Sequence, residues 1–321
     1  MSKRWPHRQW EWDEELADDL AHLVRLAIRA DLDRGCDVTT AALLPDGQAG
    51  AARLVSREAG VLAGLAGVPR LLDEFDVECR WSPEVSDGQP VSAGTVVGRL
   101  AGRAADLLAL ERTLLNYLSH LSGIATQTAA FVREVAGTAT QICETRKTVP
   151  GWQRLAKYAV RCGGGINHRT GLFDAILIKD NHLTALAQEL ALPVGSGEVA
   201  RQAVELARLA ASRMAGGMGT PDHLPLQIEV DDLSQLEAVL SAAPDLVLLD
   251  NFTLDTLRQA VELRDRAAPR VILEASGGIT LETVRGVAET GVDRISVGAL
   301  THSVRALDLA IDWDWSDDSG S

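Results

Sequence analysis

Five apolar runs from residue 140 onward end directly in residues whose side chains could do chemistry. The runs and the groups at their ends are 140–144 with Thr145-Arg146-Lys147, 175–179 with Lys179-Asp180-Asn181-His182, 226–230 with Glu229, 246–250 with Asp250, and 271–275 with Glu274 and Ser276-Gly277-Gly278. A sixth run, 294–298, ends in Gly298. One charged residue closing a strand would be unremarkable, but five in succession indicate a functional surface.

The cations of this group suggest a site for an anion that carries carboxylates. Arginine binds a carboxylate through two parallel hydrogen bonds, and lysine supplies a point charge. Arg146, Lys147 and Lys179 lie at the ends of runs, and Arg169 lies between the first two runs. His168, beside Arg169, could donate a hydrogen bond to the same anion, although an isolated histidine is more often structural. Arg154, Lys157 and Arg161 fit a solvated helix face equally well.

Two carboxylates on successive runs could hold a cation. Glu229 and Asp250 are the types of ligand that Mg²⁺ takes from proteins when substrate oxygens complete its shell. The alternative is that they cap strand ends or form salt bridges.

The glycines after the last two runs suggest a phosphate site. Ser276-Gly277-Gly278 precedes Thr280, which we expect to cap a helix that begins at residue 281. Exposed amides at a glycine turn and a helix start bind phosphate. Gly298 is a second candidate on the next loop. A plain turn is the alternative for the Gly-Gly pair.

These residues need a scaffold that brings the ends of the six runs together. Nearly continuous apolar strands joined by helices predict a parallel sheet buried on both faces. Six such strands predict an α/β barrel short of the usual eight, whose active site lies at the carboxyl ends of the strands.

The first part of the chain has a different pattern. We expect an amphipathic helix over 13–32, a small antiparallel sheet over 50–100, and a helix over 105–121 that ends at Gly123. The last helix carries an apolar stripe of Leu107, Leu110, Leu114, Leu118 and Leu121, with Arg112 on another face.

Charge and cysteine content limit the possible partners. The 321 residues carry a net charge of −14, which argues against nucleic acid as a general partner. No run approaches a membrane span, and the N-terminus lacks the apolar core of a secretory signal. The four cysteines are scattered without a CxxC pair, so we expect neither a disulfide framework nor a zinc site, and a reducing cytoplasm.

The motifs also resemble a known family. ERTLLNYLSHLSGIAT, ETRKTVPGWQRLAKYAV, GGGINHRTGLFDAILIKDNH, EASGGI and ISVGALTHS are similar to quinolinate phosphoribosyltransferase over about residues 20–312. The resemblance implies an N-terminal α/β sandwich (1–122) followed by an incomplete six-stranded parallel α/β barrel (123–303), with 304–321 packing back on the first domain. It also implies synthesis of nicotinate mononucleotide from quinolinate and 5-phosphoribosyl-1-pyrophosphate, with release of pyrophosphate and CO₂.

The resemblance implies a role for each matching residue. Thr145, Arg146, His168, Arg169 and Lys179 would hold the two quinolinate carboxylates, and Lys147 would lie between the substrates. Glu229 and Asp250 would bind the ribose hydroxyls and the Mg²⁺-pyrophosphate region. Ser276, Gly277, Gly278 and Gly298 would bind the 5-phosphate. Arg112 would enter the site of the neighbouring subunit in a homodimer.

Some alternatives and departures remain. A related phosphoribosyltransferase, nicotinate-specific or associated with molybdenum transport, is the nearest alternative, and a non-catalytic dimeric binding protein on the same fold is another. Lys179-Asp180-Asn181-His182 favours the quinolinate enzyme over the molybdenum-associated type. Residues 184–225 contain about a dozen more residues than the family pattern, and we expect 184–197 and 215–224 to be surface elaborations. Tryptophans near both termini are not required by that pattern.

Overall fold

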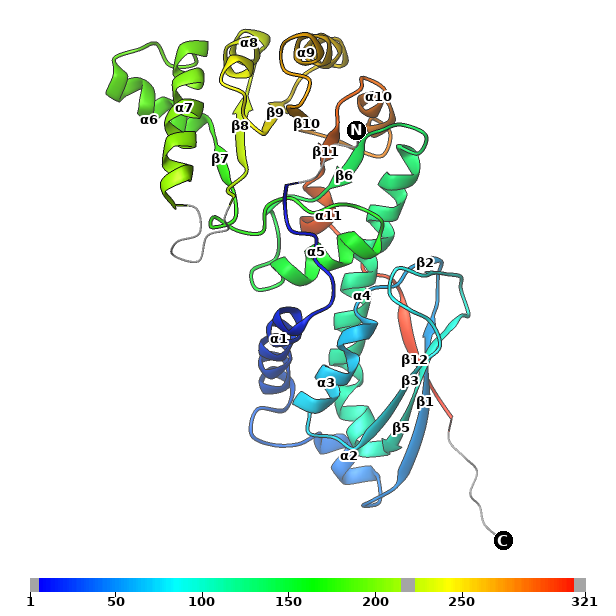
Figure 1. The fold of residues 1–321 in the computed structure, drawn as a ribbon. Helices are drawn as coiled ribbons and strands as arrows, with labels where there is room; N and C mark the ends of the chain where they lie inside the picture. Colours follow the sequence, from blue (N-terminus) through cyan, green and yellow to red (C-terminus); the bar gives the residue numbers. More distant parts are fainter. Residues whose placement is uncertain (1–5, 215–222, 315–321) are drawn as a thin grey trace. The chain divides into compact units, whose positions relative to one another are not determined.

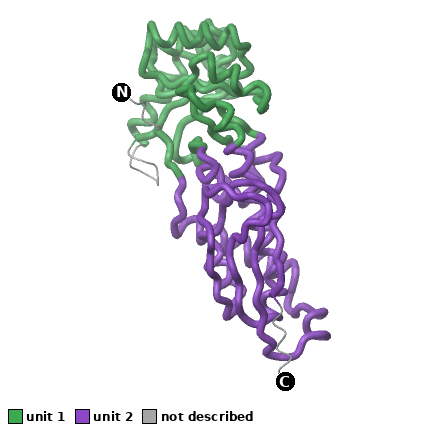
Figure 2. Tube along the Cα trace, turned by 90° about the vertical axis from the view of Figure 1, so that its right-hand side faces the viewer, with its two compact units in different colours: residues 1–9, 130–146, 165–298 green, residues 10–129, 147–164, 299–321 purple. Residues whose placement is uncertain are grey.

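The computed structural model describes residues 6–214 and 223–314, and these form two compact units (Figure 2). The first unit comprises residues 1–9, 130–146 and 165–298. The second comprises 10–129, 147–164 and 299–321. The two units therefore interleave along the chain, whereas the sequence suggested one boundary after residue 122. No helix in the described ranges is both long and apolar enough to cross a bilayer.

The first unit is built on a six-stranded parallel sheet (Figure 1). The strands are β6 (Gln141–Cys143), β7 (Ile176–Ile178), β8 (Leu226–Val230), β9 (Leu246–Asp250), β10 (Ile272–Ser276) and β11 (Arg294–Ser296). Their spatial order is β6-β11-β10-β9-β8-β7, so β6 and β7 are the two ends of an incomplete barrel. All six coincide with the predicted apolar runs, which confirms the predicted fold class.

Helices connect these strands and cover the sheet: α6 (Asp180–Leu190), α7 (Gly197–Met214), α8 (Leu233–Ser241), α9 (Leu254–Ala267) and α10 (Val284–Ala288). The prediction that 184–197 is a surface elaboration was wrong for its first part, which completes α6 and buries Ala187. At the start of α7, a Cβ on Gly197 would lie 2.8 Å from Cβ of Ala238, so α7 packs closely on α8. Most of the second predicted elaboration, 215–224, lies outside the described residues.

The second unit holds a four-stranded antiparallel sheet of order β12-β1-β5-β3. Its strands are β1 (Ala49–Ser56), β3 (Cys79–Pro83), β5 (Val96–Arg103) and β12 (Leu309–Trp313), and β2 (Gly60–Val61) pairs separately with β4 (Pro90–Val91). Its helices are α1 (Glu14–Leu32), α2 (Val38–Leu43), η1 (Leu65–Gly67), α3 (Val68–Glu74), α5 (Gln153–Cys162) and α11 (Ala299–His302). The chain returns to this sheet at β12, which pairs with β1.

The helix α4 (Ala104–Glu134) supplies much of the core of the second unit. All five leucines of the predicted stripe are at most 1% exposed. The prediction that the helix ends at Gly123 was wrong, because α4 continues through it. A Cβ at Gly123 would lie 2.4 Å from the carbonyl oxygen of Arg305. The glycine therefore permits close backbone packing and does not terminate the helix.

The tryptophans near the termini have structural roles where they are described. Trp10 is 2% exposed, and the guanidinium of Arg154 lies over its ring at 5.8 Å. Arg154 also pairs with Glu15 and Asp19 on α1, at 3.4 and 3.3 Å. Lys157, which like Arg154 belongs to α5, is fully buried. The alternative that Arg154, Lys157 and Arg161 form a solvated helix face is therefore wrong for Lys157. Trp5 and Trp315 lie outside the described residues.

Candidate active site

The carboxyl ends of β7 to β10 bring four of the predicted groups to one edge of the sheet. Lys179 directly follows β7, Glu229 lies near the end of β8, Asp250 ends β9 and Ser276 ends β10. Asp250 and Ser276 are register partners, and the amide of Asn251 donates to the carbonyl of Ser276 at 2.9 Å. Because neighbouring parallel strands place these ends side by side, the groups form one continuous edge.

Glu229 lies between a cation and other carboxylates. The Lys179 ammonium is 3.3 Å from its Oε2. Burial raises the pKa of Glu229, Lys179 lowers it, and the charges of Asp250 and Asp180 raise it further. Lys179 itself is fixed at the start of α6, where its amide donates to Nδ1 of His182 at 2.9 Å. The edge therefore carries opposite charges at close range.

Glu229 and Asp250 fit a divalent cation that is shared with a substrate. Their carboxylates lie at or near the ends of adjacent strands, and the charge of Asp250 raises the pKa of Glu229. Nδ2 of Asn251 donates to Oδ2 of Asp250 at 2.7 Å and orients that carboxylate. The described ranges contain no cluster of three or more His, Cys, Asp or Glu able to hold a metal. Two carboxylates suit Mg²⁺, which commonly takes its remaining ligands from substrate phosphates and water.

Two arginines form the cationic part of the site. Arg169 is 7% exposed, and Nη1 donates to the carbonyl of Ala175 at 3.3 Å. Burial lowers the pKa of Arg169, and the nearby positive charge of Arg146 lowers it further. Thr145 and Arg146 follow β6, and Arg146 is exposed. Two guanidinium groups that repel each other are stabilised by a ligand with negative charge, so this pair favours a carboxylate.

The glycine turn after β10 is conformationally demanding. Gly277 has φ +102°, and a Cβ there would lie 2.1 Å from Oδ1 of Asn251. Gly278 has φ +58°, with open space where its Cβ would be. Gly298 is half-buried just before α11. The predicted cap at Thr280 was wrong, because α10 begins at Val284 and Thr283 is its N-cap residue. Exposed amides at this position therefore belong to the turn and not to the start of a long helix.

A buried polar layer of Gln227, Glu274 and Arg294 lies one step deeper in the sheet. Side chains alternate along a strand, so Gln227, Glu274 and Arg294 face the same side as Glu229, Ser276 and Ser296, respectively. The prediction that Glu274 lies at a strand end was wrong, because β10 continues to Ser276 and Glu274 is fully buried. It forms an ion pair with Arg294 and accepts from Nε2 of Gln227 at 2.8 Å. A charge in the middle of an apolar strand was the available signal.

Comparisons with known proteins show the family of the chain. Residues 37–122 match the family model described as quinolinate phosphoribosyl transferase, N-terminal domain, and 124–312 match its C-terminal domain. The chain belongs to the quinolinate phosphoribosyltransferase family. It is thus an enzyme with the fold and the motif positions expected from the sequence.

Members of the quinolinate phosphoribosyltransferase family match the chain over most of its length. It is 46% identical over 291 residues to the nicotinate-nucleotide pyrophosphorylase [carboxylating] of Mycobacterium leprae, covering 90% of this chain and 95% of that protein. A probable enzyme of the same name from Bacillus subtilis is 38% identical, with 84% and 85% covered. The structure of the Francisella tularensis nicotinate-nucleotide pyrophosphorylase superposes with a TM-score of 0.81 at 33% identity, covering 96% and 100%.

Two predicted site residues of this phosphoribosyltransferase belong to the second unit. Arg112 is exposed on α4, and Lys147 is exposed directly after the residues that follow β6. The carbonyl of Lys147 accepts a hydrogen bond from Oγ1 of Thr301 at 2.8 Å, which fixes its backbone within that unit. Their participation in the site stays a prediction.

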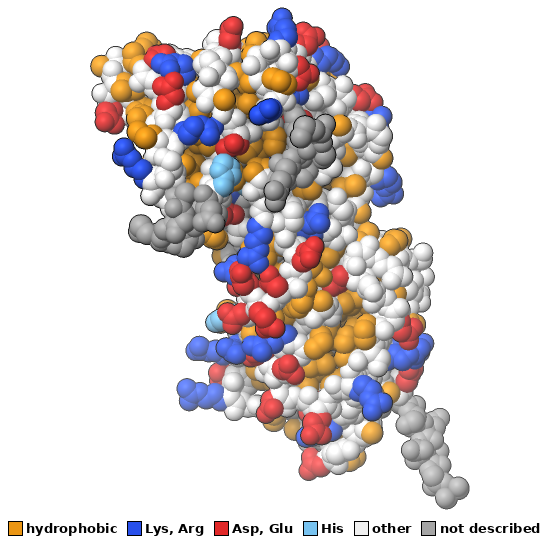
Figure 3. All heavy atoms as spheres, viewed as in Figure 1, with side chains coloured by type: hydrophobic (Ala, Val, Ile, Leu, Met, Phe, Trp, Pro, Cys, Tyr) orange, Lys and Arg blue, Asp and Glu red, His pale blue; other side chains and the backbone are white. Residues whose placement is uncertain are grey.

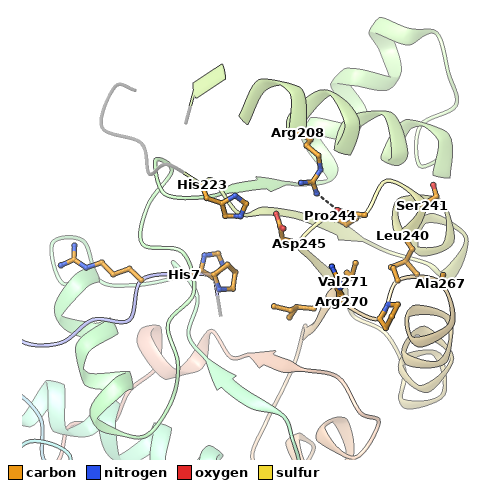
Figure 4. Close-up of a pocket in the computed structure, with 16 residues that line it drawn as sticks. His7, Arg208, His223, Leu240, Ser241, Pro244, Asp245, Ala267, Arg270 and Val271 are labelled. Carbon is orange, nitrogen blue, oxygen red and sulfur yellow. Dashed lines mark hydrogen bonds between the residues drawn. The ribbon is translucent and has the colours of Figure 1, made fainter. Parts of the chain in front are cut away.

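A large pocket of the first unit lies at the opposite ends of the strands (Figure 4). It has a volume of about 1130 Å³ and is lined by residues that precede β8, β9 and β10, among them His223, Asp245 and Arg270. In α/β barrels the amino ends of strands serve stability and the carboxyl ends carry the chemistry. The candidate site is therefore the charged edge at the carboxyl ends of β7 to β10, and not this pocket.

Proposed function

We propose that this edge joins quinolinate to 5-phosphoribosyl-1-pyrophosphate, giving nicotinate mononucleotide, pyrophosphate and CO₂ in de novo NAD biosynthesis. The observation that carries the proposal is the order of groups along the edge: Lys179, then Glu229 and Asp250, then the turn at Gly277. That order suits a dianionic base at one end and a ribose with its phosphates at the other. Membership of the family supports the same reaction.

The quinolinate end consists of Thr145, Arg146, Arg169 and Lys179, with His168 adjacent to Arg169. Arg146, Arg169 and Lys179 supply positive charge for two carboxylates, and the two guanidiniums can each form a bidentate contact. Two fixed carboxylates leave the ring little freedom to rotate. Such positioning converts part of the binding energy into correct orientation of the ring nitrogen.

The ribose end consists of Glu229 and Asp250 with Ser276, Gly277, Gly278 and Gly298. The two carboxylates accept hydrogen bonds from ribose hydroxyls, and their negative charge stabilises the cationic character that develops at the anomeric carbon. The amides of the glycine turn bind the 5-phosphate. A bound Mg²⁺ would supply positive charge to the departing pyrophosphate.

The reaction then follows from these positions. The ring nitrogen forms a bond to the anomeric carbon with inversion, and the bond to pyrophosphate breaks with its electron pair leaving on oxygen. The ring nitrogen is now cationic. The bond from ring carbon 2 to its carboxylate breaks as CO₂ leaves, the electron pair stays on carbon 2 beside that cation, and a proton replaces the carboxylate. Lys147 is proposed to lie between the two substrates.

The proposed assembly is a cytoplasmic homodimer in which Arg112 serves the neighbouring site. Its partners are small anions rather than nucleic acid or membrane. On the face shown in Figure 3, basic and acidic side chains are interspersed over the surface, without a broad basic field. That face, on a chain of net charge −14, offers no broad electrostatic attraction to a polyanion.

Release of labelled CO₂ from carboxyl-labelled quinolinate tests the function. We expect release that depends on both phosphoribosyl pyrophosphate and Mg²⁺. Product formation from nicotinate, without CO₂, would instead favour the nicotinate-specific alternative. Binding of quinolinate without any turnover would favour a non-catalytic binding protein.

A further inference from the structure

Three successive backbone amides near the site are held by side chains instead of by a strand. The amide of Asn167 donates to Oε1 of Gln9 at 2.9 Å. The amide of His168 donates to Oε1 of Glu144 at 3.0 Å. The amide of Arg169 donates to Nδ1 of His168 at 2.8 Å. Buried amides need such partners, so these side chains determine the backbone path that leads to the Arg169 guanidinium.

The last of these bonds fixes the tautomer of His168. Because Nδ1 accepts a hydrogen bond, the ring proton must be on Nε2. Nε2 lies 3.4 Å from Oε1 of Glu274, which can accept that proton's hydrogen bond. The ring of His7 stacks on the same imidazole with centroids 5.2 Å apart and an interplanar angle of 14°. The imidazole is therefore constrained by the hydrogen bond at Nδ1, by the carboxylate near Nε2 and by the stacked ring of His7, and His168 is 5% exposed.

Glu274 is itself firmly anchored. Its register partner on β11 is Arg294, with which it forms a fully buried ion pair. Burial raises the pKa of Glu274, but the charge of Arg294, together with His168 and Ser296, holds this pKa well below its ordinary value. An ionised carboxylate at this position is a strong, permanent acceptor for the imidazole N–H.

We propose that His168 is a positioning residue, held by Glu274, that orients Arg169 through its Nδ1 and does not itself touch quinolinate. The inference rests on the proposed function and deepens it, because it assigns His168 a part in quinolinate binding that acts entirely through Arg169. The contacts form one line from the buried polar layer to the site: Glu274, His168, the Arg169 amide and the Arg169 guanidinium. A direct contact from Nε2 to substrate would require the ring to give up Glu274. Supporting contacts of this kind typically decide how well a binding group is pre-organised.

Two substitutions separate the roles of the ring nitrogens. Asn occupies the place of Nδ1 and can accept the Arg169 amide, but cannot reach Glu274. Gln can donate to Glu274 from the place of Nε2, but offers no acceptor at Nδ1. If His168 positions Arg169, His168→Asn should keep quinolinate affinity within about threefold. His168→Gln should lose about tenfold or more, the free-energy equivalent of roughly one hydrogen bond to a charged group.

Quinolinate affinity is measured by titration calorimetry on the full chain, with the KM for phosphoribosyl pyrophosphate and the thermal midpoint alongside. His22→Gln, on the exposed face of α1, is the control and should change none of these. The reverse order of affinities, equal loss or equal retention in the two variants would each overturn the inference. Failure of the wild-type chain to bind quinolinate would instead contradict the proposed function.

Nitrogen NMR of the wild-type chain tests the same inference without a substitution. We expect the His168 ring to carry its proton on Nε2 in the free protein and to keep that state and its Nε2 shift when quinolinate is added. A proton on Nδ1 in the free protein would overturn the inference whether or not the chain is active. A large Nε2 change specific to quinolinate would show direct contact and overturn it as well.

Discussion

The Lys179 ammonium lies 3.3 Å from Oε2 of Glu229, which joins the quinolinate end of the proposed site to its ribose end. In the free protein each group neutralises the other. Lys179 side-chain exposure is 48% and that of Glu229 is 14%, so the lysine can turn toward a ligand while the carboxylate stays in place. When Lys179 engages a substrate carboxylate, Glu229 loses part of its stabilising charge. The two half-sites are therefore electrostatically coupled.

Glu229→Gln should reduce turnover by about a hundredfold, because the charge that stabilises the ribose is removed. The folded-state pKa of Glu229 is raised, chiefly by burial. The stability that such a group contributes is present below its ordinary pKa and is lost as pH rises through the raised value. At neutral pH the uncharged Gln side chain avoids the free-energy cost of a partly buried negative charge, so the thermal midpoint should not fall. Turnover and thermal unfolding at pH 7.5 test both, and exposed Glu262→Gln on α9 should change neither. A marked loss of stability with Gln would contradict the electrostatic account.

Arg146→Lys should raise the KM for quinolinate about tenfold or more, because a bidentate contact becomes a single point charge. The fold should survive, since Arg146 is exposed after β6. Arg258→Lys is a matched control, because Arg258 is exposed on α9 and pairs only locally with Asp255 at 2.7 Å. Steady-state kinetics compare the two variants. Unchanged quinolinate kinetics in Arg146→Lys would remove this residue from the site.

Gly277→Ala should weaken use of phosphoribosyl pyrophosphate far more than Gly278→Ala. The new Cβ at 277 would meet Oδ1 of Asn251 at 2.1 Å and displace the residue that orients Asp250. At 278 the space is open, and only the left-handed backbone is strained, by about 1 kcal/mol. The KM for phosphoribosyl pyrophosphate and the thermal midpoint distinguish the two variants. Equal effects in both would show that the close approach to Asn251 is unimportant.

Removal of divalent metal should abolish turnover and leave quinolinate binding intact. Glu229 and Asp250 provide only part of a coordination shell, so we expect the cation to be retained mainly together with pyrophosphate oxygens. Dialysis against EDTA followed by Mg²⁺ addition should remove and restore activity, and calorimetry should detect quinolinate binding throughout. Full turnover in verified metal-free buffer would exclude the proposed role of Mg²⁺.

Mixed dimers test whether Arg112 serves the neighbouring subunit. Arg112→Ala and Lys147→Ala should each be nearly inactive as homodimers. If Arg112 acts across the dimer, a mixed dimer has one site with both defects and one with neither. Exchange should then restore up to about half of wild-type activity per mixed dimer, because one of its two sites is intact.

Mass-tagged subunits establish that exchange has occurred. If Arg112 acts within its own chain, every site keeps one defect and exchange restores nothing. Mixed dimers that are demonstrated but inactive would rule out the shared site.

The sequence determined the elements and the residues at their ends. All six parallel strands were predicted from apolar runs, since strands buried on both faces are nearly continuous in hydrophobic residues. The leucine stripe of α4 was predicted for a similar reason, because helical periodicity is local. The end positions of Lys179, Glu229, Asp250 and Ser276 followed from the same runs. The roles carried over by family resemblance, including those of Arg112 and Lys147, remain predictions.

The tertiary structure decided what depends on contacts distant in sequence. Gly123 resembled a helix end until the backbone of Arg305 was seen to pack against it. Glu274 resembled a site residue until its pairing with Arg294, 20 positions away, placed it inside. The hydrogen bond from the Asn167 amide to Gln9 spans 158 positions. Local propensity cannot encode such pairings, because the partner that satisfies a buried charge or amide is chosen only when the sheet assembles.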